Sequence, residues 1–383
     1  MPDPVLWPLD DHTRAKHRVL VAYLNAWIPV LAYQAMKEAS RRSPRLLIVD
    51  GFAGPGEYAG GEPGSPLLIL RALLGHESFE RFATVQFTLL FIEHDPRRVD
   101  HLRAKVAEIP LPSNVDVVID LAAFEEAFGR HVEQMQGAGG ANIPTFAFID
   151  PFGYSTASMS LAGKFLDYPR SEALFFLPLS FIHRFVGRQG QEVALTSLFN
   201  SDRWKDAIAM EGSERQTFLL DLFERQLRQQ GQVEFVTSFR LRTRDGNDYR
   251  LVFATPHERG LELMKSAMWS VDPLQGTSYI ARTESGQQVL FQPLVDTGPL
   301  LDQLRSTFQS RWFSVPQARK VTLATPYVAE KHLKRLTLVP AEKAGEIIVQ
   351  RPDGCRAGSF TDGVRMRFAS CAEDPPQNGH DQP

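Results

Sequence analysis

Four apolar stretches of the sequence each end on a carboxylate, a pattern that points to chemistry at one edge of a sheet. The stretches are RLLIVD (45–50), FTLLFIE (87–93), VDVVID (115–120) and TFAFID (145–150), with Asp50, Glu93, Asp120 and Asp150 as their last residues. Near-continuous apolar runs separated by helical stretches are typical of a parallel sheet covered on both faces. Because ligands bind beyond the carboxyl ends of such strands, we expect these carboxylates to converge on one pocket.

A glycine-rich loop, DGFAGPGEY, begins at the last residue of the first stretch. It is not a phosphate-binding P-loop, because Glu57 follows Gly56 and the loop contains no lysine. It is not the dinucleotide fingerprint GxGxxG either, since Ala59 stands where the third glycine belongs. Ser65 as N-cap and Pro66 at the first helical position predict that the next helix begins only there. The loop therefore disfavours both nucleoside triphosphate hydrolysis and nicotinamide oxidoreduction.

The remaining candidate is an adenosine-type ligand without a phosphate group. Asp50 can face a cation while the loop glycines let the backbone approach, which suits the sulfonium and amino groups of S-adenosylmethionine. Glu93 is placed to accept both ribose hydroxyls, and Asp120 is placed to accept the adenine amine. The alternative is that Asp and Gly only mark turns after strands. The predicted cofactor-binding residues are Asp50, Phe52, Ala53, Gly54, Gly56, Ser65, Glu93, His94, Asp120 and Leu121.

The segment FIDPFG, residues 148–153, predicts the acceptor site. It resembles the Asp-Pro-Pro-Tyr type of motif in methyltransferases that act on exocyclic amino groups. Asp150 and the carbonyl of Pro151 can accept hydrogen bonds from a planar amine and draw its nitrogen towards tetrahedral geometry. Phe152 offers a face on which a flipped-out base can stack. The second proline of the motif is absent and Gly153 follows, so a merely structural turn is the alternative.

Seven segments, taken in order, resemble the three-Cys-motif partner protein family. They are HRVLVAYLNAW, DGFAGPGEY, GSPLLIL, FIEHDP, FIDPFG, SLFNSDRW and LELMKSAMWSVDP, and the resemblance covers the chain from about residue 12 to 370. The resemblance implies a class I methyltransferase-like fold with a C-terminal winged helix. It also implies a partner, a radical-S-adenosylmethionine-like protein that carries the three cysteines. By position it assigns cofactor and acceptor groups to Asp50, Gly54, Gly56, Glu93, Asp120 and Asp150.

Composition limits the class of protein. Of the 383 residues, 43% are hydrophobic and 23% are charged, which is typical of a globular chain of two domains. Cys355 and Cys371 form no CxxC motif, and no Ser-His-Asp set or His spacing for a metal emerges, so we expect no metal. Neither a secretory signal nor a run of 18 or more apolar residues is seen, so a cytoplasmic protein without membrane association is expected.

The order of elements predicts an α/β fold. We expect a helix over 13–39 with a kink at Pro29, a doubly wound, mostly parallel Rossmann-like sheet, and an antiparallel hairpin at one edge, turning at Asp245-Gly246. Three short helices and a small hairpin then predict a C-terminal winged helix-turn-helix domain. The expected divisions are a helical segment (1–42), the methyltransferase-like domain (43–275), the winged domain (276–370) and a disordered tail (371–383).

The C-terminal domain carries the basic charge of a chain whose formal net charge is −3. Residues 303–370 hold 12 Lys or Arg against 5 Asp or Glu. A recognition helix there would present its basic side chains to DNA or RNA. The alternatives are a solvated helix face or a protein contact. The predicted nucleic-acid-binding residues are Lys331, His332, Lys334 and Arg335.

Four further polar residues are weaker candidates for the site. Lys16 and His17 are expected to be exposed first-turn residues rather than a cap on the acceptor pocket, and Ser180 and His183 to be structural. The leading hypothesis is an S-adenosylmethionine-dependent N-methyltransferase acting on an exocyclic amino group of a nucleic-acid base. The alternative is a catalytically silent, methyltransferase-like binding module that docks the three-Cys-motif partner.

Overall fold

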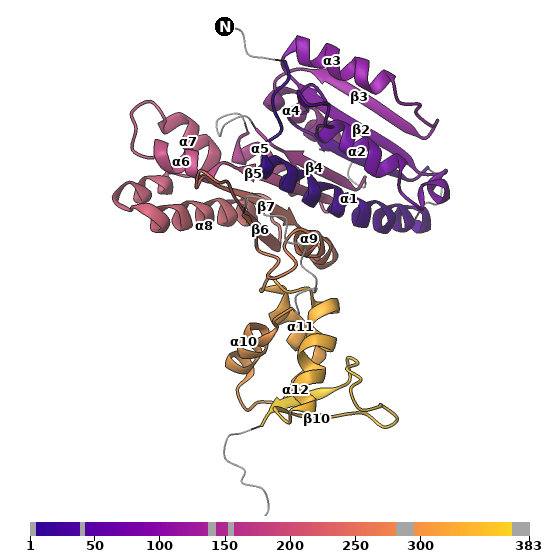
Figure 1. Ribbon diagram of the computed structural model, residues 1–383, viewed down its shortest axis with the longest axis vertical. Helices are drawn as coiled ribbons and strands as arrows, with labels where there is room; N and C mark the ends of the chain where they lie inside the picture. The colour runs from indigo at the N-terminus through magenta and orange to yellow at the C-terminus, as the bar shows by residue number, and fades with distance from the viewer. Residues whose placement is uncertain (1–4, 39–42, 137–142, 152–156, 281–294, 370–383) are drawn as a thin grey trace, which may run out of the picture. The chain divides into compact units, whose positions relative to one another are not determined.

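The computed structural model describes residues 5–38, 43–136, 143–151, 157–280 and 295–369 (Figure 1). The predicted acceptor residues Phe152 and Gly153 lie outside the described residues. The chain divides into two compact units, Met1–Asp272 with Gly276–Val289 and Pro273–Gln275 with Leu290–Pro383, and each is described by itself.

An eight-stranded sheet organises the first unit, in the order β3-β2-β1-β4-β5-β7-β6-β8. Strands β1 to β5 are parallel, β7 is antiparallel to β5 and β6, and β8 is parallel to β6. The order reverses between β1 and β4, so the sheet is doubly wound with its switch point there. This confirms the predicted α/β sheet. The strands are β1 (Arg45–Asp50), β2 (Gln86–Glu93), β3 (Val115–Leu121), β4 (Thr145–Ile149), β5 (Ser171–Leu177), β6 (Phe235–Arg242), β7 (Asp248–Thr255) and β8 (Ser278–Ile280).

Helices cover both faces of this sheet because its strands are apolar on both sides. In β1, Ile48 packs into one hydrophobic cluster, while Leu47 and Val49 pack into the other. The first cluster lies under α1 (Asp11–Glu38), α2 (Ser65–Leu74), η1 (Phe79–Phe82), α3 (Pro96–Ala107) and α9 (Glu258–Val271). The second lies under α4 (Phe124–Gln136), α5 (Met159–Leu166), α6 (Leu179–Phe185), α7 (Glu192–Phe199), η2 (Asp202–Ala209) and α8 (Gly212–Gln230).

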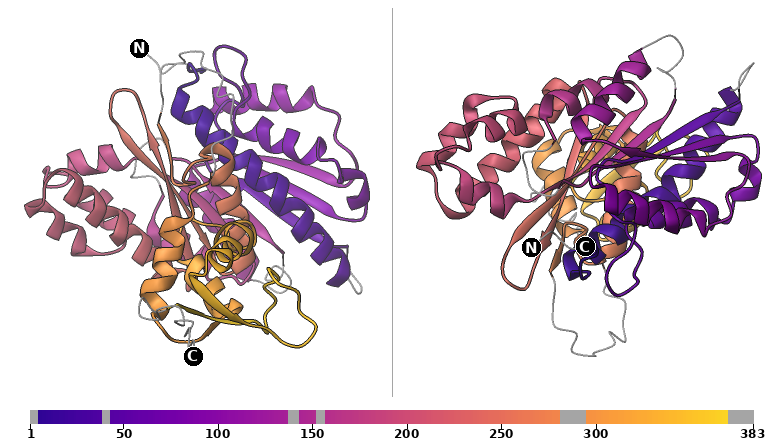
Figure 2. Two further views of the ribbon diagram at one scale, coloured as in Figure 1. Left: turned by 60° about the horizontal axis from the view of Figure 1, so that its bottom comes forward. Right: turned by 90° about the horizontal axis from the view of Figure 1, so that it is seen from above.

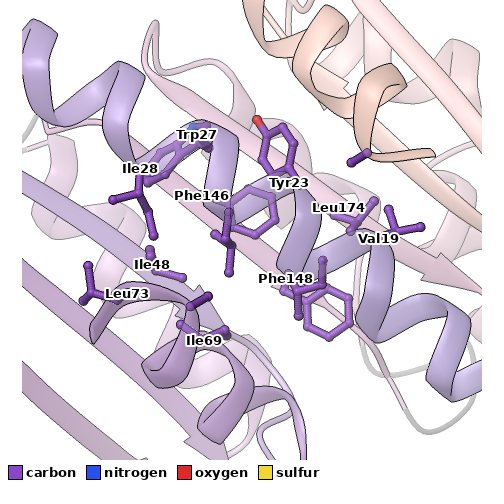
Figure 3. Close-up of a cluster of buried hydrophobic side chains, with 14 of the residues drawn as sticks. Val19, Tyr23, Trp27, Ile28, Ile48, Ile69, Leu73, Phe146, Phe148 and Leu174 are labelled. Carbon is purple, nitrogen blue, oxygen red and sulfur yellow. The ribbon is translucent and has the colours of Figure 1, made fainter. Parts of the chain in front are cut away.

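Helix α1 packs along the sheet with its aromatic side chains buried in the first cluster. Tyr23 and Trp27 meet Phe146 of β4 at ring-centroid distances of 5.1 and 6.1 Å (Figure 3). The helix begins two residues before the predicted start and keeps Pro29 inside it. By length and composition alone α1 could cross a membrane, but a buried face of this kind is typical of the core helix of a globular protein.

The described residues of the second unit form four helical segments and a three-stranded antiparallel sheet in the order β10-β11-β9. Figure 2 draws these residues in orange to yellow. Leu300, Leu333 and Met366 belong to its buried core. The predicted helices and hairpin are present, but the third helix has π-helical hydrogen bonding, and β9 was not predicted. The elements are α10 (Gly298–Phe308), β9 (Phe313–Ser314), α11 (Val315–Leu323), η3 (Ala329–Leu338), α12 (Val339–Lys343), β10 (Ile347–Gln350) and β11 (Arg365–Phe368).

Candidate functional site at the switch point of the sheet

Asp50 ends β1 and is fully buried. The amide of Phe52 donates to its Oδ1 at 3.3 Å. Burial raises the pKa of Asp50 to about 7, and hydrogen bonds from Ser65 and Phe52 oppose the rise only in part. Near neutral pH this carboxyl is therefore poised between its two forms, and a cation beside it would favour the ionised one.

The loop after Asp50 turns tightly because two of its glycines adopt conformations that favour glycine. Gly54 has φ +62° and Gly56 has φ +87°, both in the left-handed region. A Cβ at Gly56 would also lie 2.7 Å from Cδ1 of Leu102. Ser65 is the first residue of α2 and Gly64 is its N-cap, without a side-chain cap, so the predicted Ser65 N-cap is wrong. The Ser65 hydroxyl instead hydrogen-bonds with Asp50.

Glu93 ends β2 and fastens the glycine loop to the neighbouring strand. Its Oε2 accepts from the amide of Gly54 at 3.0 Å, and its Oε1 accepts from the amides of His94 and Asp95 at 2.9 and 2.8 Å. The carboxylate is buried, whereas the His94 side chain is 65% exposed. Glu93 thus fixes the backbone of the glycine loop and of the segment after β2. The sequence alone did not predict this role.

Asp120 lies on β3, the edge strand beside β2, where the register pairs it with Ile92. It precedes Leu121, which ends β3, so the prediction that Asp120 ends the strand is one residue short. Arg130 of α4 forms an ion pair with its Oδ2 at 2.9 Å, and Leu121 is exposed. The Asp120 carboxylate therefore faces α4.

A cavity of about 510 Å³ opens at the carboxyl edge of β1, β4 and β5. The glycine loop, the segment before α1, the first turns of α1, the tip of β4, the end of β5 and the start of β7 enclose it. Asp150 is the one carboxylate of the predicted four among its lining residues, so the expected convergence of all four on one cavity is wrong. The lining includes Trp7, His12, Lys16, Phe52, Ala53, Gly54, Gly56, Tyr58, Ser65, Asp150, Pro151, Phe176, Phe181 and Tyr249.

Stacked rings form one wall of this cavity. His12 stacks on Tyr249 with ring centroids 4.7 Å apart and planes 5° apart. Tyr249 in turn stacks on Phe176 at 5.1 Å. Burial lowers the pKa of His12, and the charge of Lys16 lowers it further. The nearby carboxylates raise this pKa, but by less. The wall therefore offers neutral, flat surfaces of the kind on which a planar ring can stack.

Lys16 pairs with Asp150 in the lining of the cavity. Its Nζ forms an ion pair with Oδ2 of Asp150 and lies 4.4 Å from the centroid of the Phe176 ring. The Lys16 side chain is only 7% exposed, and burial lowers the pKa of neighbouring His17 to about 3. The prediction that these two residues are exposed is wrong, because α1 starts at Asp11 and turns them towards the sheet.

The remaining candidates of the first unit are Ser180 and His183. The Ser180 hydroxyl accepts from the amide of Asp248 at 2.7 Å, which agrees with a structural role. His183 does not line the cavity, and burial lowers its pKa. Within the described ranges, no group of three or more His, Cys, Asp or Glu side chains could hold a metal ion.

The basic residues of η3 differ in their access to solvent. Lys331 and Arg335 are exposed and Lys334 is half-buried. His332 is buried, and its Nδ1 accepts from the amide of Val328 at 2.9 Å. The predicted role of His332 in binding nucleic acid does not fit this geometry, because the ring fastens the start of its own helix.

Comparison with known proteins finds distant structural neighbours only. No protein-family profile matches the chain, and no curated protein matches it. Trm1 from Pyrococcus horikoshii, solved in complex with S-adenosyl-L-methionine, is 10% identical over 97% of this chain and 93% of that chain, with a TM-score of 0.38. The cyclopropane synthase MmaA2 from Mycobacterium tuberculosis is 15% identical over 64% of this chain and 68% of its own, with a TM-score of 0.25. The description of the fold therefore rests on the strand order of this chain.

Proposed function

We propose that this protein is an S-adenosylmethionine-dependent methyltransferase. The observation that carries the proposal is the cavity at the switch point between β1 and β4, which lies between the glycine loop and Asp150-Pro151. Ligands of doubly wound sheets bind at this position. In the proposal the cofactor lies along the glycine loop. Asp50 and Glu93 do not line the cavity, so Asp50 acts on the cofactor's amino group through its charge and Glu93 acts by holding the loop.

The residues present fit such a cofactor. A buried carboxyl with a pKa of about 7 gains an ionic partner when a cationic amino group arrives. The left-handed glycines give the loop a shape that a side chain would strain, and Glu93 holds it there. S-adenosylmethionine, when bound, supplies a methyl group on a positively charged sulfur.

The proposed acceptor is an exocyclic amino group of a nucleic-acid base. Asp150 Oδ1 and the carbonyl of Pro151 accept hydrogen bonds from the amine, which orients its lone pair and stabilises the charge that develops on nitrogen. The Phe176 and Tyr249 rings support the base by stacking, and the ring wall limits access of water. Lys16 holds the Asp150 carboxylate by its other oxygen, Oδ2.

The second unit is proposed to be a winged helix-turn-helix that docks DNA or RNA. The helical segments α10, α11 and η3 with α12, followed by a β-hairpin, support this assignment, as does the surplus of basic residues between 303 and 370. Exposed Lys331 and Arg335, with half-buried Lys334, are the proposed contacts to phosphate on η3.

Calorimetry with S-adenosylmethionine tests the cofactor. We expect binding by the wild type and at least tenfold weaker binding by Asp50→Ala and Glu93→Ala, because each loses a carboxylate that meets or shapes the ligand site. Asp116→Ala removes an exposed carboxylate from β3 and is the matched control. Absence of binding by the wild type, or unchanged binding by both site variants, would remove the proposal.

Mass spectrometry of nucleosides tests the acceptor after incubation of the protein with DNA and with RNA. We expect an N-methylated base in one polymer, and a loss of about a hundredfold or more in Asp150→Asn, which cannot accept through a charged oxygen. Asp150→Asn should still bind the cofactor in the calorimeter. Unmodified bases in both polymers would leave only cofactor binding.

One observation favours a second candidate, a binding module that docks a three-Cys-motif radical-type partner. In the ion pair with Lys16, the Asp150 carboxylate already has a charged partner. If that pair is permanent, the carboxylate serves the structure of the cavity and not an acceptor. Co-purification with the partner, together with an Asp150→Asn variant that changes no product, would favour this candidate.

A further inference from the structure

The outer face of the three-stranded sheet in the second unit carries a set of side chains that the core does not use. Register pairs Ile348 with Arg367 and Gln350 with Arg365, and pairs Arg365 with Ser314. Side chains on one face of a sheet recur at every second residue. Trp312, two residues before Ser314, therefore belongs to the same row as Arg367 and Ile348.

The side chains on the opposite face of this sheet are buried in the core. Ile347, Met366 and Phe313 are buried there, one from each strand. On the outer face, by contrast, Trp312 and Ile348 are each 38% exposed. The guanidinium of Arg367 lies over the Trp312 ring at 5.6 Å. A tryptophan left partly open beside an arginine is a surface on which another flat, electron-rich ring can stack.

The charge of this face is positive. Arg365 is exposed on β11, two residues from Arg367 along the same strand. Two nearby carboxylates are engaged elsewhere, since Glu346 pairs with Arg305 at 2.5 Å and Glu342 pairs with Arg351 at 2.6 Å. Asp353 and Asp362 are exposed in the loop that joins β10 and β11. The two arginines on the outer face are thus placed to meet an anionic partner.

We infer that this outer face, defined by Trp312, Ile348, Gln350, Arg365 and Arg367, binds single-stranded nucleic acid. A base stacks on Trp312, and the two arginines meet the backbone phosphates. The shallow sheet favours a single strand, because the bases of a duplex are already stacked on each other and present no free face. The inference deepens the proposed function, since a base that is to be methylated in the cavity must first be unpaired.

Fluorescence anisotropy with labelled 12-nucleotide single strands tests the inference on the full chain. We expect Trp312→Ala to weaken binding about tenfold and Trp312→Phe to restore most of it, because stacking needs an aromatic ring. Arg365→Ala with Arg367→Ala should reduce the slope of log K against log salt by about 1.4, since each phosphate contact on a single strand contributes about 0.7. RNA and DNA strands of one sequence distinguish the two polymers.

Binding by a triple variant of η3 and binding of a duplex can each contradict the inference. The triple variant Lys331→Ala, Lys334→Ala, Arg335→Ala removes the proposed contacts of η3; if it abolishes single-strand binding while Trp312→Ala does not change it, the outer face is not the site. Equal or tighter binding of a matched duplex also overturns the inference. Asp50→Ala should retain strand binding while losing the cofactor, so failure of the outer face is distinguishable from failure of the methyltransferase proposal. Thermal unfolding of each variant confirms that it is folded.

Discussion

Replacement of Asp50 by asparagine should stabilise the ligand-free protein at alkaline pH. Burial raises the pKa of this carboxyl from 3.8 to about 7, so the folded state holds a proton that the unfolded chain has already released. Between the two pKa values the folded state binds more protons than the unfolded state, and stability falls as pH rises. With about 1.4 kcal/mol for each pKa unit, the ionisation cost is about 2 kcal/mol at pH 5 and about 4 kcal/mol at pH 8.

Urea unfolding at pH 5 and pH 8 measures this cost. The wild type should lose about 2 to 3 kcal/mol more over this range than Asp50→Asn, which cannot ionise. Asp116→Asn, an exposed carboxylate on β3, is the control for removing one negative charge from the same unit. If Asp50→Asn and the wild type show the same dependence on pH, then Asp50 does not titrate near neutrality and the argument for a poised carboxyl is refuted.

The remaining predictions concern the same unit. Calorimetry should show about fivefold tighter binding of S-adenosylmethionine at pH 7 than at pH 6, because a pKa of about 7 makes more of Asp50 ionised; affinity that is independent of pH would contradict this. A double-mutant cycle with Lys16→Met and Asp150→Asn should give a coupling of about 1 to 3 kcal/mol by urea unfolding, since the pair is largely buried; additive effects would mean that the two charges do not interact. Gly260→Ala should lower the melting temperature through a loss of about 2 to 4 kcal/mol, because its Cβ would lie 2.0 Å from Oε1 of buried Glu172; an unchanged melting temperature would show that Glu172 is free to move.

The sheet was predictable because local sequence determines it. Strands such as RLLIVD and TFAFID are apolar on both sides, and a parallel sheet buried on both faces requires this. The turn at Gly246, with φ +79°, was also predictable, since few other residues tolerate that conformation. These features depend on neighbours along the chain.

The details of the site depend on contacts between distant segments and were not predictable. The burial of Lys16 follows from where α1 begins and from Asp150, which lies 134 residues away. Glu172 is the second residue of β5, a mostly apolar strand, yet Tyr23, Trp27 and Thr255 all donate to its buried carboxylate. One signal for the burial of Lys16 was present in the sequence: it lies seven residues before Tyr23, which lies four before Trp27, and residues at these spacings share one face of a helix.

Helix α1 is a single element that contacts the parallel strands at both of their ends. Lys16 meets Asp150 at the cavity, and farther along the same helix Tyr23 and Trp27 donate to Glu172, near the other end of the parallel strands. Each residue of an α-helix advances the side chains by about 100°. An insertion of a single residue between Lys16 and Tyr23 would therefore put the two groups of contacts out of phase, so that one of them must be lost. Natural variation in the length of this stretch should be confined to changes that preserve whole turns.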